Sequence, residues 1–325
     1  MKIVFLALFL CFAAGAYDIS PDVCTRASAQ AVRLTNDKLE IRFSLTLGRL
    51  VWFGEKGGKN LLWLNDDKII SDYHKKHPRS YLNFGGDKIW SIPQCLWEAA
   101  FGKKWPPHIP LEGMPWTIVQ QNADSISVKS QFIPRLGIEL QRTFTLSGNP
   151  SALIVKNTIR RISANPYPVQ IWSISQLKMP AFCVAEIPEQ KMPYSWIFYN
   201  GAEYGKITAQ GRVLRQELCF EELGSKSGTL GRFAGAVYPD GKVLLQIHKV
   251  RPEGCYPERA SIQLHTNSYY VELETLDELC HLLPGESRSN QVIWSIFSTK
   301  GNGSAESDLY KIIFSKAEDL YKFCF

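Results

Sequence analysis

The sequence lacks the short motifs that identify several enzyme classes directly. It contains no Gly-x-Ser-x-Gly nucleophile elbow and no His-Glu-x-x-His zinc helix. It also has no glycine-rich phosphate loop and no calcium loop of alternating Asp and Asn. None of the eight cysteines is spaced Cys-x-x-Cys, so we expect no zinc knuckle. A serine hydrolase, a zinc protease and a nucleotide-binding enzyme are therefore disfavoured, and we predict no metal site and no cofactor.

A strong excess of charge of one sign is also missing. The 325 residues carry 37 Lys and Arg against 31 Asp and Glu, a net charge of +6. The longest basic cluster is the short tetrapeptide His-Lys-Lys-His at 74–77. Recognition of nucleic acid requires a denser basic stripe than this, so we predict no nucleic-acid partner.

Long apolar runs are absent except at the start of the chain. Ile3 to Phe12 is apolar, follows Lys2, and precedes the small residues Ala-Gly-Ala at 14–16. This pattern is typical of a cleaved signal peptide, here residues 1–16, and we predict a secreted or periplasmic protein. No later run approaches the ~20 apolar residues of a membrane helix, so no membrane span is expected after cleavage. Seven cysteines then remain, enough either for three disulfides and one thiol or for free thiols.

Strand periodicity dominates the rest of the chain. From Lys38 to Leu47 apolar and polar residues alternate over ten positions, until Gly48. Similar stretches recur, at 125–132, 137–146, 153–159, 169–177, 242–248, 261–265, 269–273 and 291–297. A helical period appears only near the end, from about Ser304. This succession of strand-like stretches with one helix at the end predicts an all-β fold, a large antiparallel sandwich or barrel with one C-terminal helix.

Residues 78–116 depart from this rhythm. They hold six of the 18 prolines and four of the nine tryptophans. Because proline opposes pairing within a sheet, we expect a long, stiff loop with short strands at most. Indoles beside polar side chains suit the apolar faces and hydroxyl rims of sugars, although each tryptophan could equally pack in the core.

Two segments carry a resemblance to a known superfamily. Residues 83–94 read Asn-Phe-Gly-Gly-Asp-Lys-Ile-Trp-Ser-Ile-Pro-Gln and are followed by Trp-Pro-Pro at 105–107. Residues 270–276 read Tyr-Val-Glu-Leu-Glu-Thr-Leu and are followed by Leu-Pro-Gly-Glu at 283–286. Together they resemble the signatures of an uncharacterised family within the galactose-mutarotase-like superfamily, whose aldose 1-epimerases have a similar Leu-Glu-Thr strand and Pro-Gly-Glu turn.

The resemblance runs from about Val32 to Phe297. It implies a two-sheet β-supersandwich that binds carbohydrate, a mono- or oligosaccharide, in a cleft on its concave face. We accordingly divide the chain into a signal peptide (1–16), an N-terminal segment (17–31), a mutarotase-like domain (32–300) and a helical tail (301–325).

The resemblance also implies roles for individual residues. Glu274 corresponds to the epimerase base that deprotonates the anomeric hydroxyl, and Glu272 shares its strand face. The epimerase histidine that acts as general acid is missing, since its place falls within Trp-Ser-Ile at 172–174. His108 and His248 are the candidates to replace it, with His265 and Tyr256 as further alternatives, although each could be structural. The implied substrate-binding residues are Asp87, Lys88, Trp90, Trp105, Trp172, Gln176 and Glu272.

Two classes of function therefore stay open. One is an epimerase- or lyase-type enzyme with Glu274 as base, which should place Glu274 within ~3 Å of a second titratable group in an open pocket. The other is a non-catalytic protein, either a glycan-recognition module with a row of exposed aromatic rings or a structural envelope protein. The structural protein would bury all four tryptophans of the proline-rich segment, Trp90, Trp97, Trp105 and Trp116.

Overall fold

The computed structural model describes eight stretches of the chain, residues 19–21, 30–65, 83–105, 107–189, 195–197, 206–220, 224–299 and 306–325. The predicted signal peptide lies outside the described residues.

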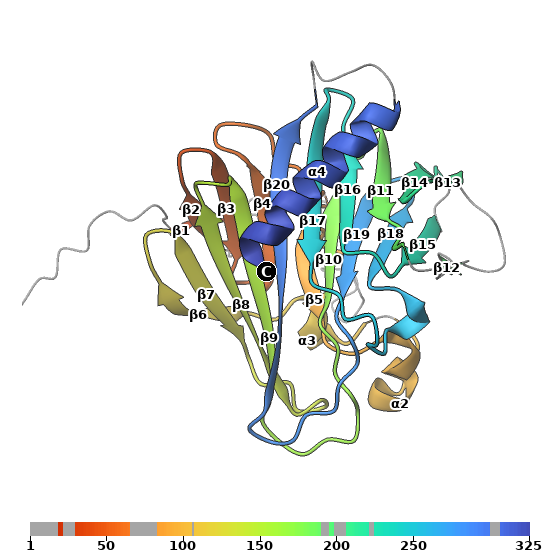
Figure 1. Ribbon diagram of the computed structural model, residues 1–325. Helices are drawn as coiled ribbons and strands as arrows, with labels where there is room; N and C mark the ends of the chain where they lie inside the picture. The colour runs from red at the N-terminus through yellow and green to blue at the C-terminus, as the bar shows by residue number, and fades with distance from the viewer. Residues whose placement is uncertain are drawn as a thin grey trace, which may run out of the picture.

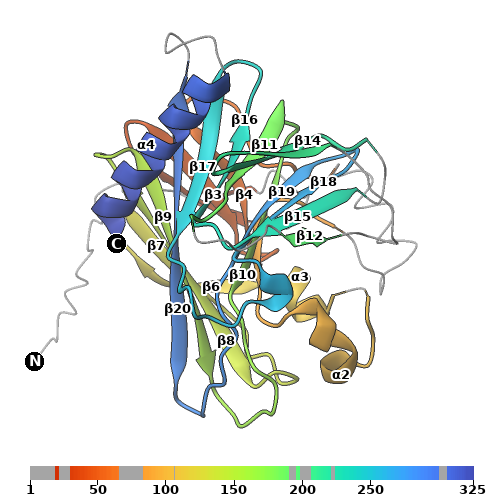
Figure 2. The same cartoon turned by 45° about the vertical axis from the view of Figure 1, so that its right-hand side comes forward.

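Two ten-stranded antiparallel sheets face each other and form the body of the protein (Figures 1 and 2). The first sheet has the order β1 (Ile19–Pro21), β2 (Gln30–Thr35), β3 (Leu39–Ser44), β4 (Arg49–Glu55), β5 (Asp87–Trp90), β10 (Trp172–Leu177), β19 (Val271–Leu276), β18 (Ile262–Thr266), β15 (Ser225–Thr229) and β12 (Ser195–Ile197). The second sheet has the order β13 (Ile207–Gln210), β14 (Val213–Glu217), β11 (Phe182–Glu186), β16 (Phe233–Val237), β17 (Lys242–His248), β20 (Ser287–Ser298), β9 (Ala152–Arg161), β8 (Ile138–Ser147), β7 (Ser125–Ser130) and β6 (Trp116–Gln121).

The core between the sheets follows from the strand periodicity. In β3 the side chains of Leu39, Ile41 and Phe43 are at most 2% exposed. They meet the alternating buried side of β8, where the Phe43 and Phe144 rings lie 5.3 Å apart. Burying one such apolar side chain stabilises the fold by about 1.5–3 kcal/mol. The prediction of an all-β sandwich is confirmed.

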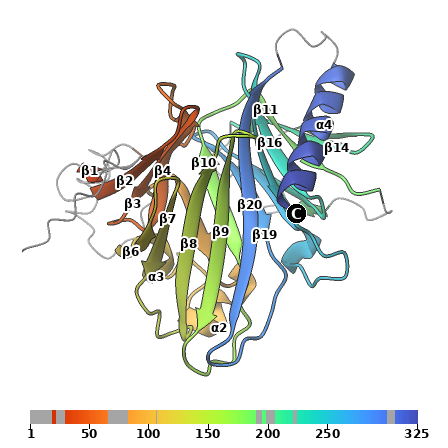
Figure 3. The same cartoon turned by 60° about the vertical axis from the view of Figure 1, so that its left-hand side comes forward.

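A helix covers the outer face of the second sheet. Helix α4 (Glu306–Cys324) buries Tyr310, Ile313, Ala317 and Leu320, and these residues pack in one cluster with outward-facing residues of β16, β17 and β20. Figure 3 shows this helix outside the sheet that contains β20, β9 and β8. The predicted C-terminal helix is thus present. Among the described residues, no helix combines the length and apolarity that crossing a bilayer requires.

The proline-rich segment is more ordered than we expected. Its residues 87–90 form β5, which lies in the middle of the first sheet between β4 and β10. It also contains the 3-10 helix η1 (Gln94–Leu96) and the short helices α2 (Trp97–Phe101) and α3 (Ile109–Glu112). A further 3-10 helix, η2 (Pro257–Arg259), lies before β18. The four-residue β5 agrees with the prediction of short strands at most, whereas the short helices were not expected. Pro110 lies in the first turn of α3, where proline is tolerated.

The cysteines form fewer bridges than an exported chain would allow. Cys95, Cys183, Cys255, Cys280 and Cys324 are free thiols, and Cys24 lies outside the described residues. Three disulfides among the seven cysteines are therefore excluded. Burial raises the pKa of the Cys183 thiol, which keeps that group neutral.

Candidate functional site

Antiparallel pairing gathers charged and aromatic side chains on one face of the first sheet. On β10, Ile174 lies opposite Lys88 of β5 and opposite Glu274 of β19. The next row joins Gln176, Glu272 of β19, His265 of β18 and Lys226 of β15, and a third row pairs Trp172 with Trp90. Residues opposite one another in a sheet share a face, so five strands contribute to a single group. With Glu112 of α3, we name this group the first-sheet cluster: Lys88, Trp90, Glu112, Trp172, Gln176, Lys226, His265, Glu272 and Glu274.

Glu274 forms the first centre of the cluster. Its Oε1 lies 2.9 Å from Nζ of Lys226, and its Oε2 accepts a 2.7 Å hydrogen bond from Nε1 of Trp172. Burial raises the pKa of Glu274 and the negative charge of Glu272 adds to this, while Lys226 opposes both. The net effect is a raised pKa, which brings this carboxyl closer to the neutral range where acid–base catalysts work.

Glu272 lies two residues away and titrates in the opposite direction. His265 Nδ1 is 3.1 Å from its Oε2, and Gln176 donates a 2.8 Å hydrogen bond to its Oε1. Burial alone would raise the pKa of Glu272, but the hydrogen bond and charge of His265, aided by Lys226, lower it to about 2. Neighbouring carboxyl groups with pKa values moved apart are the arrangement that acid–base sites use.

Glu112 forms the second centre. Lys88 Nζ lies 2.6 Å from its Oε1, Trp90 Nε1 donates a 2.7 Å hydrogen bond to the same atom, and Arg49 Nη2 lies 3.0 Å from its Oε2. Burial raises the pKa of Glu112, yet the two cations outweigh it and the pKa is lowered. Burial lowers the pKa of Lys88, with Glu112 opposing. The indoles of Trp90 and Trp172 connect the two centres, with ring centroids 4.9 Å apart.

Asp87, a predicted substrate-binding residue, belongs to the opposite face of the same strand. Its carboxylate is fully buried between the sheets, 2.5 Å from Nη2 of Arg142, and accepts a 2.9 Å hydrogen bond from Ser175. Successive residues of a strand point to opposite faces, so Asp87 and Lys88 do not line one cavity. Asp87 is paired within the interior and lies outside the first-sheet cluster.

The structure does not bring His108 or His248 to Glu274. His108 stacks on Phe101 near α2, with ring centroids 4.6 Å apart, and burial lowers its pKa. His248 ends β17 in the second sheet, where burial lowers its pKa to about 4 despite a hydrogen bond with the Gly231 backbone. The histidine within the first-sheet cluster is His265.

The tryptophans divide into buried and exposed members. Trp90, Trp97, Trp116 and Trp172 are at most 7% exposed, whereas Trp105 is 51% exposed and stacks on Trp97 with centroids 5.9 Å apart. Every charged side chain of the first-sheet cluster is also shielded, the most accessible being Glu272 at 15%. The cluster therefore meets one expectation for an enzyme, a titratable partner within ~3 Å of Glu274, but its charged side chains are shielded and not in the open pocket that was expected.

Two members of the cluster were not singled out as site residues from the sequence. Lys226 lies in a strand of otherwise small residues, Ser-Lys-Ser-Gly-Thr, and a lone lysine in a fully buried strand is the signal that could have found it. Glu112 is one of several polar residues near the tryptophans of residues 78–116, and no sequence feature distinguishes it from Glu98. No group of three or more His, Cys, Asp or Glu side chains is placed to hold a metal ion in the described part of the chain.

The two antiparallel sheets form a sandwich with the fold of solved galactose mutarotase-like structures. Solved structures align over most of this chain and over the whole of theirs. A galactose mutarotase-like protein from Lactobacillus casei ATCC 334 aligns with a TM-score of 0.57 at 10% identity, covering 82% of this chain and 100% of that one. The Slr1438 protein from Synechocystis sp. PCC 6803 gives 0.56 at 13% identity, covering 87% and 100%. A protein from Escherichia coli K12 assigned as an aldose 1-epimerase gives 0.55 at 12% identity, covering 83% and 100%.

These similarities establish the fold. They confirm the predicted two-sheet fold, whereas no family model and no curated protein matches the sequence. The chain departs from the expected epimerase pattern where Ile174 stands opposite Glu274, since an apolar side chain cannot supply a proton.

Proposed function

We propose that this protein is exported, binds a carbohydrate at the first-sheet cluster and catalyses an epimerase- or lyase-type proton transfer with Glu274 as base. The observation that carries the proposal is the buried pair of Glu274 and Lys226, 2.9 Å apart on a sheet face that also presents tryptophans. A buried carboxylate beside a single cation and a second carboxylate is an expensive arrangement for stability alone. Such perturbed, paired groups concentrate at functional sites.

The chemistry assigns a separate role to each group. Glu274, with its raised pKa, binds a proton from a sugar hydroxyl or ring carbon more tightly than an ordinary glutamate. Lys226 takes the place of the missing histidine and either donates a proton or stabilises the developing negative charge. Glu272 stays ionised and holds His265, while Gln176 orients Glu272. Because the charged side chains of the cluster are shielded, we expect substrate binding to require a local rearrangement around them.

Support for a carbohydrate and for export comes from separate features. The fold is that of solved structures described as galactose mutarotase-like, and indoles next to carboxylates and amides suit sugar rings. Export rests on the sequence at residues 1–16, with a secreted or periplasmic destination.

A sugar-isomerisation screen by NMR tests the proposal with three proteins. Wild type and Glu98→Gln, which alters an exposed ion pair with Lys104, should interconvert the same sugar at equal rates. Glu274→Gln should still bind it but turn it over at least ~100-fold more slowly, because the amide cannot accept the proton. Equal turnover by Glu274→Gln and wild type would reject Glu274 as the base.

A second candidate, non-catalytic glycan recognition, is favoured by Trp105. Its indole is half exposed and backed by Trp97, as in a stacking platform for a pyranose. In that case Trp105→Ala should abolish glycan binding in an array, and neither wild type nor any variant should interconvert a sugar. Turnover by wild type would exclude this candidate.

A further inference from the structure

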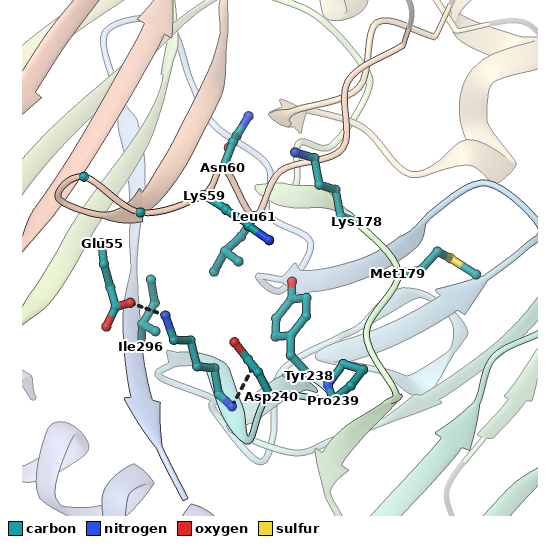
Figure 4. Close-up of a pocket in the computed structure, with 13 residues that line it drawn as sticks. Glu55, Lys59, Asn60, Leu61, Lys178, Met179, Tyr238, Pro239, Asp240 and Ile296 are labelled. Atoms are coloured by element: carbon teal, nitrogen blue, oxygen red, sulfur yellow. Dashed lines mark hydrogen bonds and ion pairs between the residues drawn. The ribbon is translucent and has the colours of Figure 1, made fainter. Parts of the chain in front are cut away.

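A cavity of about 640 Å³ lies at one end of the sandwich, where neither Glu274 nor any other member of the first-sheet cluster lines it. Its walls come from the loop after β4, the connection between β10 and β11, the turn between β16 and β17, and β20 (Figure 4). The residues used below are Lys59, Leu61, Lys178, Met179, Tyr238 and Ile296. The volume falls within the ~300–1,000 Å³ of small-molecule sites.

One part of the cavity wall is apolar. Leu61, Met179 and Ile296 are each half-buried and border the same space, although they come from three separate segments of the chain (Figure 4). Pockets for organic ligands are lined mostly by such side chains, with a few polar groups to orient the ligand. The cavity therefore suits a ligand with an apolar body.

The hydroxyl of Tyr238 supplies an unused donor. Its oxygen is buried and has no hydrogen-bond partner among the residues that the structure describes. In Figure 4 the hydroxyl points toward Leu61 and Lys59. Burial raises the pKa of Tyr238, so the hydroxyl keeps its proton at neutral pH. A buried polar group is normally paired, and a bound acceptor atom would pair this one.

The rim of the cavity carries more positive than negative charge. Lys59, Lys178 and Lys242 face Glu55 and Asp240, which leaves a net charge of +1. Lys242 is paired with Glu55, and the Asp240 carboxylate accepts a 3.1 Å hydrogen bond from the Lys242 backbone. Lys59 and Lys178 form no ion pair with any described residue, and their ammonium groups remain available to an anion.

We propose that this cavity is a second binding site, for a small organic anion with an apolar body. The anionic group lies between Lys59, Lys178 and the Tyr238 hydroxyl, and the body packs on Leu61, Met179 and Ile296. Charge-assisted hydrogen bonds to the ammonium groups select the anion, while the apolar wall adds affinity for a ligand with an apolar body. The site is independent of the sugar chemistry assigned to Glu274.

Two matched dyes test the site on the full chain. 8-Anilinonaphthalene-1-sulfonate has an aromatic body and a sulfonate, and N-phenyl-1-naphthylamine has the same body without the charge. Fluorescence titration of wild type should give saturable one-to-one binding of the sulfonate dye. The Lys59→Gln/Lys178→Gln double variant should bind it at least ~10-fold more weakly, with the neutral dye unchanged. Lys56→Gln, an exposed lysine outside the cavity, should match wild type for both dyes.

Two further variants locate the bound dye within the protein. Tyr238→Phe removes only the unpaired hydroxyl, so its thermal stability should not fall while its affinity for the sulfonate dye drops ~3- to 10-fold. Glu274→Gln should leave dye binding intact, which separates this site from the first-sheet cluster. The proposal is overturned if no saturable binding occurs, if the double variant binds the sulfonate dye as wild type does, or if it loses both dyes equally.

Discussion

Glu112 and Glu274 have closely similar surroundings, and they differ in the charges that face them. Each is buried, each accepts a 2.7 Å hydrogen bond from a tryptophan indole, and each lies within 3 Å of a lysine ammonium group. Glu112 has a second cation, Arg49, whereas Glu274 has a second anion, Glu272. Accordingly the pKa of Glu112 is lowered and that of Glu274 is raised.

The difference separates a carboxylate that is held in its charged form from one whose charged form is poorly stabilised. Two cations hold Glu112 in its charged form, and this anchors α3 against β4 and β5. At Glu274 the charge of Lys226, with a smaller contribution from His265, does not outweigh burial and the neighbouring carboxylate, so its two protonation states lie closer in free energy. The same types of side chain can therefore stabilise the fold at one position and remain available for proton transfer at the next.

The largest effect should come from removing the Glu112 charge. Glu112→Gln leaves Lys88 and Arg49 facing each other in a buried site, which should lower the free energy of unfolding by about 3–5 kcal/mol at neutral pH. Urea denaturation measures this loss. Glu98→Gln, on the exposed surface, should stay within ~0.5 kcal/mol of wild type. A loss from Glu112→Gln as small as that of Glu98→Gln would show that Glu112 is not a structural centre.

The decrease in unfolding free energy at acidic pH should depend on Glu272. Its pKa of about 2 lies below the usual 4.5, so its contribution is present above pH 4.5 and is lost as the pH falls to about 2. Over that window the loss is on the order of 3 kcal/mol. Glu272→Gln should flatten this part of the pH profile in denaturation experiments. An unchanged slope would mean that His265 does not hold Glu272 in its charged form.

A smaller loss is expected for Glu274→Gln. Its raised pKa means that the folded state stabilises the charged form poorly, and the amide still accepts the hydrogen bond from Trp172. Glu272 remains to compensate Lys226. We expect unfolding free energy to fall by about 1–2 kcal/mol, measured beside Glu112→Gln under the same conditions. Equal losses in the two variants would remove the distinction between the centres.

The smallest effect should be a shift in the pKa of Glu274. Lys226→Met removes the main cation that opposes burial at Glu274, so the pKa of Glu274 should rise further. Carboxyl ¹³C NMR measures this shift directly. Lys104→Met, at an exposed position, serves as the control. A lower pKa for Glu274 in Lys226→Met would contradict the assigned charges.

Much of the fold could be predicted from local patterns. The alternation in Leu39–Ser44 and the apolar spacing in Glu306–Cys324 are each set by neighbours along the chain, and both elements are found. Strand β5 is one of the short strands allowed for residues 78–116, but its position was not predicted. Its place in the middle of a sheet depends on pairing with β10, which is more than 80 positions away.

The candidate site was predictable only in part. The resemblance pointed to Glu274, Glu272, Lys88 and Trp172, and these residues do lie on one face of the first sheet. It could not separate Asp87 from Lys88, because the strand direction decides which of two adjacent residues faces the interior. The resemblance also could not show that His108 and His248 lie apart from Glu274, because their positions depend on how distant segments pack.

By itself, the sequence determined the class of architecture, because residue alternation along each strand selects the buried side. Only the tertiary structure decided which charges meet. Lys226 reaches Glu274 because β15, β18 and β19 pair in register, and Arg49 reaches Glu112 because α3 packs beside β4. Electrostatic energies depend on separations of a few ångströms between residues far apart in the chain. The pKa values of Glu112 and Glu274 differ for this reason.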